Sequence, residues 1–182
     1  MGKIPGAGQP ESATAKLLPE DRYAHVLPYR GTPGKRPGII VDLDGTVALH
    51  CGTIADGKSW QHRGHYDYSL VHLDLPNEPI IELVTTLYNA GFDVVYLTGR
   101  EDQCRDLTAG WLAGHIPGIE EYELYMRTTG DHRQDFLIKY DLFNAHIRNR
   151  VDVKFAFDDR AQVVKLWRAM GIPTLQVAEG DF

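Results

Sequence analysis

The segment Gly38–Thr46, which reads Gly-Ile-Ile-Val-Asp-Leu-Asp-Gly-Thr, places the strongest constraint on the fold of this chain. Its uninterrupted apolar run, Ile39–Val41, is typical of a strand that is buried on both faces inside a parallel sheet. Two carboxylates, Asp42 and Asp44, follow at once, and Gly45 then permits a sharp turn. Open α/β sheets bind ligands at the carboxyl ends of such strands. The segment therefore predicts a ligand site built on two acids.

Two carboxylates this close do not both stay ionised unless a cation shares their charge. A hard divalent ion with oxygen ligands fits such a site, and Mg²⁺ is the ion that we expect. The alternative is a plain strand-end turn in which the acids cap the next segment, because short motifs of this kind also occur without any chemistry. The rest of the chain decides between these two interpretations.

Composition bounds the class of protein. The chain of 182 residues, 43% of them hydrophobic, fits one compact domain with a full core. Its two cysteines, Cys51 and Cys104, form no disulfide framework and indicate a reducing compartment. No apolar run reaches membrane-spanning length and no signal peptide is visible, so we expect a cytoplasmic location. The net charge of −6 argues against broad coating of nucleic acid, but not against a site for one strand end.

Two parts of the chain lack the regular patterns of helices and strands. Residues 1–36 carry Gly, Pro and scattered charge, and we interpret them as a flexible N-terminal tail or linker that precedes a domain over residues 37–182. Val47–Pro76 is polar and crowded with aromatic and histidine side chains, which is typical of a flap insert over a site. A zinc cluster of His50, Cys51, His62 and His65 is the alternative for this insert, but their spacing matches no standard zinc pattern. We expect these histidines to face solvent or the substrate instead.

Helix and strand patterns alternate over the rest of the chain. Apolar periodicity with capping and terminating residues predicts helices over Glu78–Ala90, Glu101–Ala113, Asp131–Asn149 and Arg160–Met170. The helix start at Asp131 rests on a capping-box pattern with Gln134. Short apolar runs predict strands over Phe92–Leu97, Glu123–Met126, Val153–Phe157 and Thr174–Val177. The alternation predicts an α/β fold with a doubly wound, Rossmann-like sheet of five parallel strands and right-handed crossovers.

Polar side chains follow three of the predicted strands where those strands end. These pairs are Asp42 and Asp44, Thr98 and Arg100, and Asp158 and Asp159. The ends of parallel strands meet at one edge of a sheet, so we expect the three pairs to converge. Helix capping would explain single residues of this kind, but not paired acids at two strand ends. Lys139 adds a cation, with Asp135 four residues earlier to orient it.

The motifs at Asp42–Thr46, Thr98–Arg100, Lys139 and Phe157–Asp159 stand in the order of the four motifs of haloacid-dehalogenase-like phosphatases, which the chain resembles over about Gly38–Phe182. The resemblance is closest to the 3′-phosphatase domain of phage-type polynucleotide kinase/phosphatase. It is carried further by Arg63–Asp67, Gly130–Arg133, Asp158–Val164 with Trp167, and Gln176–Phe182. The departures are Thr98 where that domain has Ser, the long N-terminal segment, and the lack of a kinase P-loop, so no 5′-kinase activity is expected from this chain.

The resemblance implies a Mg²⁺-dependent phosphomonoesterase that works through an aspartyl-phosphate. Asp42 is then the nucleophile, and Asp44 is the general acid and base. Phosphatases and phosphomutases of the family keep this second acid, whereas its ATPases and dehalogenases do not. Thr98 and Lys139 are expected to hold phosphate oxygens. The expected metal ligands are Asp42, the backbone carbonyl of Asp44, Asp158 and Asp159, and the expected substrate-binding residues are Arg63, Arg100 and Arg133.

The predicted insert has no room for a full cap domain, so we expect an open site that admits the end of a polymer. Trp60, Tyr66 and Tyr68 are then able to stack a terminal base, unless they only pack the flap onto the sheet. The favoured hypothesis is a phosphatase for the 3′ ends of DNA or RNA, with 2′,3′-cyclic phosphates as a further substrate and a kinase or ligase as partner. The alternatives are a phosphatase for free nucleotides or another small phosphorylated metabolite, and a non-catalytic domain that binds phosphorylated ends.

Overall fold

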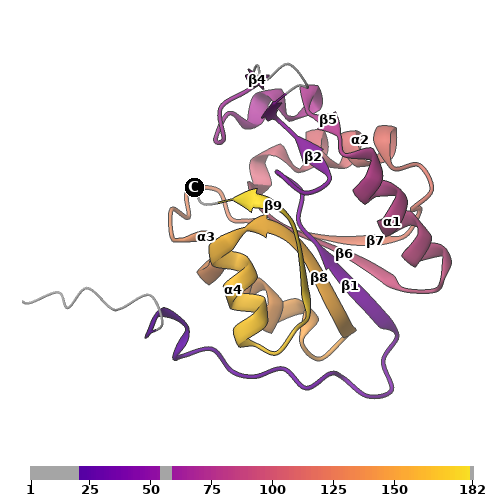
Figure 1. The fold of residues 1–182 in the computed structure, drawn as a ribbon, viewed down its shortest axis with the longest axis vertical. Helices are drawn as coiled ribbons and strands as arrows, with labels where there is room; N and C mark the ends of the chain where they lie inside the picture. Colours follow the sequence, from indigo (N-terminus) through magenta and orange to yellow (C-terminus); the bar gives the residue numbers. More distant parts are fainter. Residues whose placement is uncertain (1–20, 54–58, 181–182) are drawn as a thin grey trace, which may run out of the picture.

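The computed structural model describes residues 21–53 and 59–180. Its centre is a sheet of five parallel strands with β1 (Pro37–Val41) in the middle (Figure 1). From one edge to the other, the strand order is β7 (Tyr122–Arg127), β6 (Asp93–Glu101), β1, β8 (Asp152–Arg160) and β9 (Thr174–Gly180). The predicted α/β class and five-stranded parallel sheet are confirmed.

Helices cover both faces of this sheet. Alternate residues of β1 point to opposite faces, so its apolar side chains enter two separate cores. Ile39 and Val41 pack into a core with residues of α1 (Glu78–Asn89) and α2 (Arg105–His115). Ile40 lies in a second core with residues of α3 (Asp135–Leu142) and α4 (Ala161–Ala169). This arrangement explains why β1 reads as a continuous apolar run. No helix within the described ranges is long and apolar enough to span a membrane.

The helix predicted from Asp131 was wrong at its start. The helix α3 begins at Asp135 after Gln134, and Asp131 instead accepts hydrogen bonds from the backbone N–H and guanidinium of Arg133. The carboxylate of Asp131 thus stabilises a turn before the helix. The backbone N–H and guanidinium of Arg133 occupy the oxygens of Asp131 that a helix cap would use. The end of the predicted helix is also different, since Phe143–Ile147 form a π-helical turn, η4.

The predicted insert between β1 and α1 folds into small paired segments that stand over one end of the sheet (Figure 1). Two antiparallel pairs join β2 (Ala48–Leu49) to β5 (Leu75–Pro76) and β3 (Cys51–Thr53) to β4 (Ser59–Gln61). A 3₁₀ helix, η2 (Tyr68–Leu73), precedes β5 and contacts α2. The segment is short and contributes side chains to the site rather than enclosing it as a separate domain.

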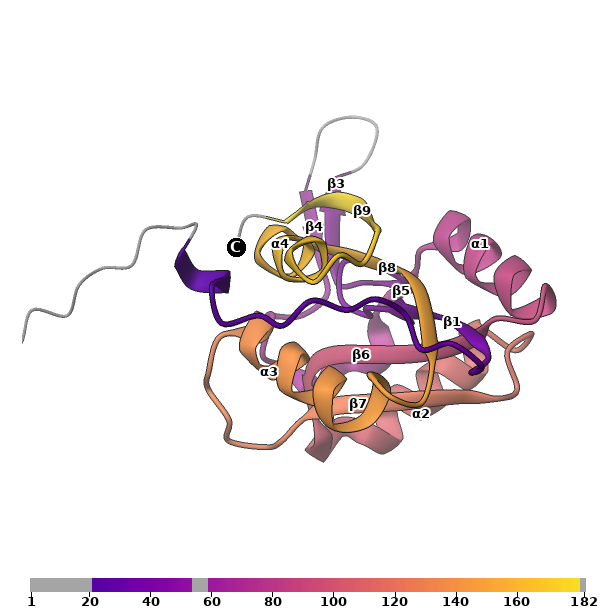
Figure 2. The same cartoon turned by 90° about the horizontal axis from the view of Figure 1, so that it is seen from below.

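The described part of the N-terminal segment, residues 21–36, runs along the helices of the second core (Figure 2). Tyr29 is buried there and donates from its hydroxyl to the carbonyl of Val151 at 3.0 Å. Arg148 donates to the carbonyls of Leu27 and Pro28, which ties the segment to the end of the α3 region. The rest of the predicted tail lies outside the described residues, and the division into tail and domain stays a prediction.

Candidate active site

Asp42 directly follows β1 at the carboxyl edge of the sheet. Its backbone N–H donates to the carbonyl of Phe157 on β8 at 3.0 Å, which places the residue between the two central strands. The Asp42 carboxylate is buried and accepts a hydrogen bond from Lys139 Nζ at 2.7 Å. The same Nζ donates to Asp158 Oδ2 at 2.9 Å and lies 3.7 Å from Asp135 Oδ2. Lys139 therefore joins β1, β8 and α3 through one buried cation.

Three of the predicted metal ligands come together beside Lys139. Carboxylate oxygens of Asp42, Asp158 and Asp159 lie within 4.8 Å of one another. The pKa is raised to about 7 for Asp42, to about 6 for Asp158 and to about 7 for Asp159. Burial is the main cause and neighbouring carboxylates add to it, while Lys139 acts in the opposite direction. One ammonium does not balance three buried carboxylates, so this donor set fits a hard divalent cation. A contribution from the Asp44 carbonyl stays a prediction.

This is the one group of three or more possible metal-ligating side chains within residues 21–53 and 59–180. The four alternative zinc ligands of the insert do not form such a group. Gly45 lets the acids approach, because it has φ +82° and a Cβ there would overlap Asp159 Oδ2. A side chain at this turn would therefore be strained and would displace a predicted metal ligand.

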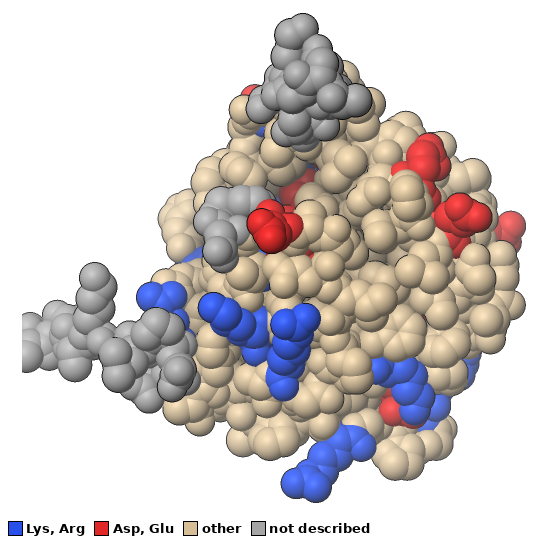
Figure 3. Space-filling view, in the orientation of Figure 1, with Lys and Arg blue, Asp and Glu red and all other residues tan. Residues whose placement is uncertain are grey.

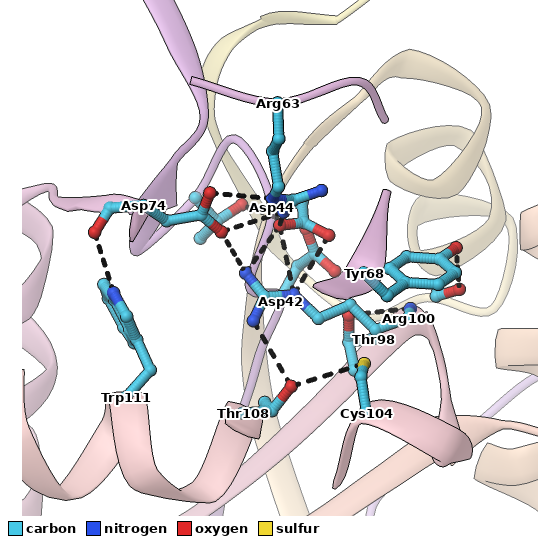
Figure 4. Close-up of polar contacts among 12 residues, drawn as sticks. Asp42, Asp44, Arg63, Tyr68, Asp74, Thr98, Arg100, Cys104, Thr108 and Trp111 are labelled. Carbon is cyan, nitrogen blue, oxygen red and sulfur yellow. Dashed lines mark hydrogen bonds and ion pairs between the residues drawn. The ribbon is translucent and has the colours of Figure 1, made fainter. Parts of the chain in front are cut away.

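Asp44 lies in an opposite environment, between two arginines (Figure 4). Arg63 Nη2 donates to Asp44 Oδ1 at 2.5 Å, and Arg100 donates from Nη2 to the same oxygen at 2.7 Å. Asp74 lies behind the pair and accepts from Arg63 Nε at 2.8 Å and from Arg100 Nη2 at 2.7 Å. Although burial raises the pKa of Asp44, the two guanidinium groups lower it more, and the pKa lies below its usual value. Two acids that follow the same strand, Asp42 and Asp44, thus lie in different electrostatic surroundings.

The arginine pair does not line the pocket above Asp42 and Asp44. Both guanidinium groups are fully buried and bound to carboxylates, and Arg100 also donates to Thr108 Oγ1 at 3.3 Å. Arg133 lies further out, exposed and paired with Asp131 and Asp141. Substrate binding by Arg63, Arg100 and Arg133 stays a prediction, and the contacts of the first two favour a role in holding Asp44.

The pocket itself has a volume of about 50 Å³. Asp42, Asp44 and Thr98 line it. Thr98 is fully buried, and its Oγ1 accepts a hydrogen bond from the Arg100 backbone N–H at 3.2 Å. The pKa of Lys139 is raised well above its usual value, because its three carboxylate partners outweigh the effect of burial. Lys139 therefore stays charged beside Asp42. The remaining lining side chains come from the insert, from the ends of β7 and β8 and from the start of α3: His50, His65, Tyr66, Tyr68, Arg127, Asp135, Asp159 and Arg160.

Three of the residues at this site, Arg127, Arg160 and Asp74, were missed by the sequence analysis. Arg127 ends β7 and Arg160 ends β8, so the strand-end rule that found the acids already contained the signal for both arginines. Arg127 Nη2 donates to Asp135 Oδ1 at 3.1 Å, and Arg160 Nη1 lies 3.4 Å from Asp135 Oδ2. Asp74 belongs to the insert, where no periodic pattern points to it. His50, a candidate zinc ligand or a solvated or substrate-facing histidine in the sequence analysis, lines the pocket.

A comparison with known protein families matches the part of the chain that contains these site residues. The family model described as "Polynucleotide kinase PNKP phosphatase domain" matches residues 36–182. The chain belongs to this family. It is a phosphatase domain of the haloacid-dehalogenase-like type, and the resemblance seen in the sequence is confirmed. The match includes both strand-end acid pairs, Lys139 and the whole insert.

Relatives of the domain occur in longer proteins. It is 34% identical over 162 residues to a protein of Autographa californica nuclear polyhedrosis virus named "Putative bifunctional polynucleotide kinase/RNA ligase", a match to 88% of this chain and 22% of the viral protein. A chain in the solved Pnkp1/Rnl/Hen1 RNA repair complex is 35% identical with a TM-score of 0.73, over 86% of this chain and 47% of that one. A chain in a second structure of the Pnkp1/Rnl/Hen1 complex is 34% identical with a TM-score of 0.74, over 87% of this chain and 52% of that one. This chain thus spans about half of each solved chain and a smaller part of the viral relative.

Proposed function

We propose that this phosphatase domain removes 3′-phosphates from nucleic-acid ends in a Mg²⁺-dependent reaction through an aspartyl-phosphate. The observation that carries the proposal is the contrast between two acids on one strand end. Asp42 lies with Lys139 and two further carboxylates, whereas Asp44 lies between two arginines. The two carboxyl groups thus have separate partners, so each can carry its own charge and act independently, as a nucleophile and a general acid must.

In the first step, a carboxylate oxygen of Asp42 attacks phosphorus in line and the bond between phosphorus and the alcohol oxygen breaks. Asp44 gives its proton to the leaving alkoxide. The arginines lower the pKa of Asp44 in the free site, and the approaching phosphate anion raises it again. In the second step Asp44 takes a proton from water, the resulting hydroxide attacks the phosphoaspartate, and Asp42 and inorganic phosphate are released.

Charge on the transferring group is balanced by fixed cations and donors. Lys139 Nζ lies beside the attacking oxygen, and Thr98, Arg127 and Arg160 line the pocket. Asp42, Asp158 and Asp159 would hold Mg²⁺. When bound, the ion would lower the pKa of the nucleophile and reduce its repulsion of the anionic ester.

A polymer end fits the open shape of the site. The small pocket continues into a groove of about 330 Å³ lined by Tyr66, Tyr68, Arg127, Arg133 and Arg160, among others. Tyrosines and arginines along one groove suit the bases and phosphates of a strand end. The groove also includes Gln162 on α4. In Figure 3, Lys and Arg side chains gather around this helix, whereas Asp and Glu side chains lie mostly toward α1. On this face of the molecule, basic and acidic side chains therefore lie in different regions.

The partners that we propose are of the same kind as those of the relatives. One matched structure is an RNA repair complex, and the viral relative is named as a kinase and ligase. A kinase or ligase, on another chain or on another part of a longer chain, would use the hydroxyl end that this domain produces.

The deciding experiment measures phosphate release from an oligonucleotide with a 3′-phosphate and from the same strand with a 5′-phosphate, each with Mg²⁺ and with EDTA. The expected result is release from the 3′ end alone and only with Mg²⁺. Release from neither strand, with turnover of mononucleotides, would move the substrate class to small metabolites. Binding of the 3′-phosphate without any release would make this a non-catalytic domain and overturn the proposal.

A further inference from the structure

His50 is a buried side chain of the pocket that the proposed chemistry does not use. It follows β2 in the insert, it is only 3% exposed, and it lines the same pocket as Asp42 and Asp44. Neither of its ring nitrogens has a hydrogen-bond partner among the described residues. Its nearest aromatic neighbour is His65, whose ring lies edge-on to it with the centroids 4.6 Å apart.

Two unpaired polar atoms in a buried ring reduce stability, and an apolar ring would fill the same space without that loss. Most polar groups at this site have several partners; Arg63, for example, donates to two carboxylates and two carbonyls. The unpaired nitrogens of His50 therefore call for a ligand that arrives with the substrate. Burial lowers the pKa of His50, so the ring is neutral at pH 7 and offers one donor and one acceptor.

The position of His50 indicates which part of the substrate it meets. Arg63 donates both to Asp44 Oδ1 and to the backbone carbonyl of His65. The ring of His65 packs against that of His50, which therefore lies on the Asp44 side of the pocket. Asp44 is the residue that protonates the leaving alcohol, and a neighbour of Asp44 faces the sugar rather than the transferred phosphate. The oxygens of a phosphate dianion only accept hydrogen bonds, whereas a hydroxyl group both donates and accepts and can pair with either nitrogen of a neutral imidazole. In a nucleotide with a 3′-phosphate, the hydroxyl next to the leaving oxygen is the 2′-hydroxyl.

We propose that His50 binds the 2′-hydroxyl of the terminal nucleotide and makes this site prefer RNA ends to DNA ends. The 2′-hydroxyl is also the group by which proteins distinguish the two nucleic acids. This inference rests on the proposed 3′-phosphatase function and adds the substrate class to it.

The test uses three oligonucleotides that differ only in the last sugar, which carries a 3′-phosphate on ribose, 2′-deoxyribose or 2′-O-methylribose. Wild-type protein is expected to have a kcat/KM about tenfold higher on the ribose end than on the deoxyribose end, as for one buried hydrogen bond. The 2′-O-methyl end is expected to react more slowly than the ribose end, because the methyl group removes the donor and adds bulk.

In His50→Phe, and in His50→Leu in case the larger ring does not fit, the ratio between ribose and deoxyribose ends is expected to fall to about one. His72→Phe is the matched control, since His72 is an exposed histidine of the same insert, and it should keep the wild-type ratio. The melting temperature of the His50 variants should equal or exceed that of wild type, because they lose two unpaired buried atoms.

Two outcomes would overturn the inference while leaving the proposed function intact. One is equal kcat/KM of wild type on ribose and deoxyribose ends, and the other is an equal loss on both ends in the His50 variants. Absence of release from every 3′-phosphate by wild type would instead be the failure of the proposed function itself.

Discussion

Lys139 Nζ lies 2.7 Å from Asp42 Oδ1, although 97 positions separate the two residues in the chain. Both groups are buried, and the same ammonium contacts Asp158 at 2.9 Å. An exposed helix pair of Lys139 with Asp135 would contribute only a few tenths of a kcal/mol. The observed contact instead places a permanent cation between the proposed nucleophile and a proposed metal ligand.

Asp42→Asn is expected to abolish turnover while the fold is kept. The amide has nearly the same shape as the carboxylate, but it is a very poor nucleophile, so phosphate release should fall more than about 10³-fold. Phosphate release and the melting temperature are measured on the same preparation. Retention of a tenth of the wild-type rate in this variant would remove Asp42 from its proposed role.

Asp44→Asn is expected to slow the reaction more for a poor leaving group than for a good one. A sugar alkoxide needs a proton as it leaves, whereas an activated phenolate does not, so the loss should be about 10²-fold or more with the 3′-phosphate end and much smaller with an aryl phosphate. The ratio of the two rates, variant against wild type, is the measurement. An equal loss on both substrates would argue against general-acid catalysis by Asp44.

Asp74→Asn is expected to disturb the arginine pair that holds Asp44. Asp74 is buried and accepts from both Arg63 and Arg100, so losing its charge leaves two guanidinium groups with one carboxylate and lowers the pKa of Asp44 further. Breaking a buried ion pair of this kind costs about 3–5 kcal/mol of stability. The reaction should slow more with a sugar leaving group than with an aryl phosphate.

The control for this variant is Asp67→Asn, which changes an exposed acid of the same insert. It should leave both the stability and the ratio of the two rates unchanged. If Asp74→Asn lowers the rates on both substrates equally, Asp74 acts on stability alone and does not position the acid.

The stability of the metal-free protein is expected to fall as the pH rises. The pKa of Asp42 is raised to about 7, of Asp158 to about 6 and of Asp159 to about 7, from a usual 3.8. A raised pKa means that the folded state binds protons more tightly than the unfolded chain, so this contribution is full below about pH 4 and is lost between there and about pH 7.

Mg²⁺ is expected to reverse this trend because it binds the ionised carboxylates. The increase in melting temperature caused by Mg²⁺, against EDTA, should therefore grow from pH 5 to pH 8. Asp158→Asn should lose most of that increase. An increase of the same size at every pH, or one that survives in Asp158→Asn, would place the ion elsewhere.

Gly45→Ala is expected to reduce both stability and activity. The added Cβ would overlap Asp159 Oδ2 and would also sit at φ +82°. Gly34→Ala is the matched control, since Gly34 has the same φ of +82° and no atom within 4 Å of the added Cβ. Melting temperature and phosphate release are compared for the two variants, and only Gly45→Ala should lose activity. Equal effects in both would mean that backbone strain alone is responsible.

The pattern of apolar runs, each followed by polar residues, was sufficient to predict the sheet and the convergence of Asp42, Asp158 and Asp159. The reason is topological, because parallel strands bring their carboxyl ends to one edge whatever their loops do. Local signals were weaker. The capping pattern at Asp131 predicted a helix start that lies at Asp135, since the neighbouring Arg133 takes up the oxygens that the cap would need.

The sequence by itself determined which element carries each functional residue. Two acids follow β1, a threonine and an arginine lie along β6, a lysine lies on α3, and two acids lie along β8. Only the tertiary structure decided which partner each acid has. Asp42 receives Lys139, whereas Asp44, two residues away, receives Arg63 from the insert and Arg100 from β6. The physical reason is that the insert has no periodic pattern, and the position of its side chains depends on how it packs over the sheet.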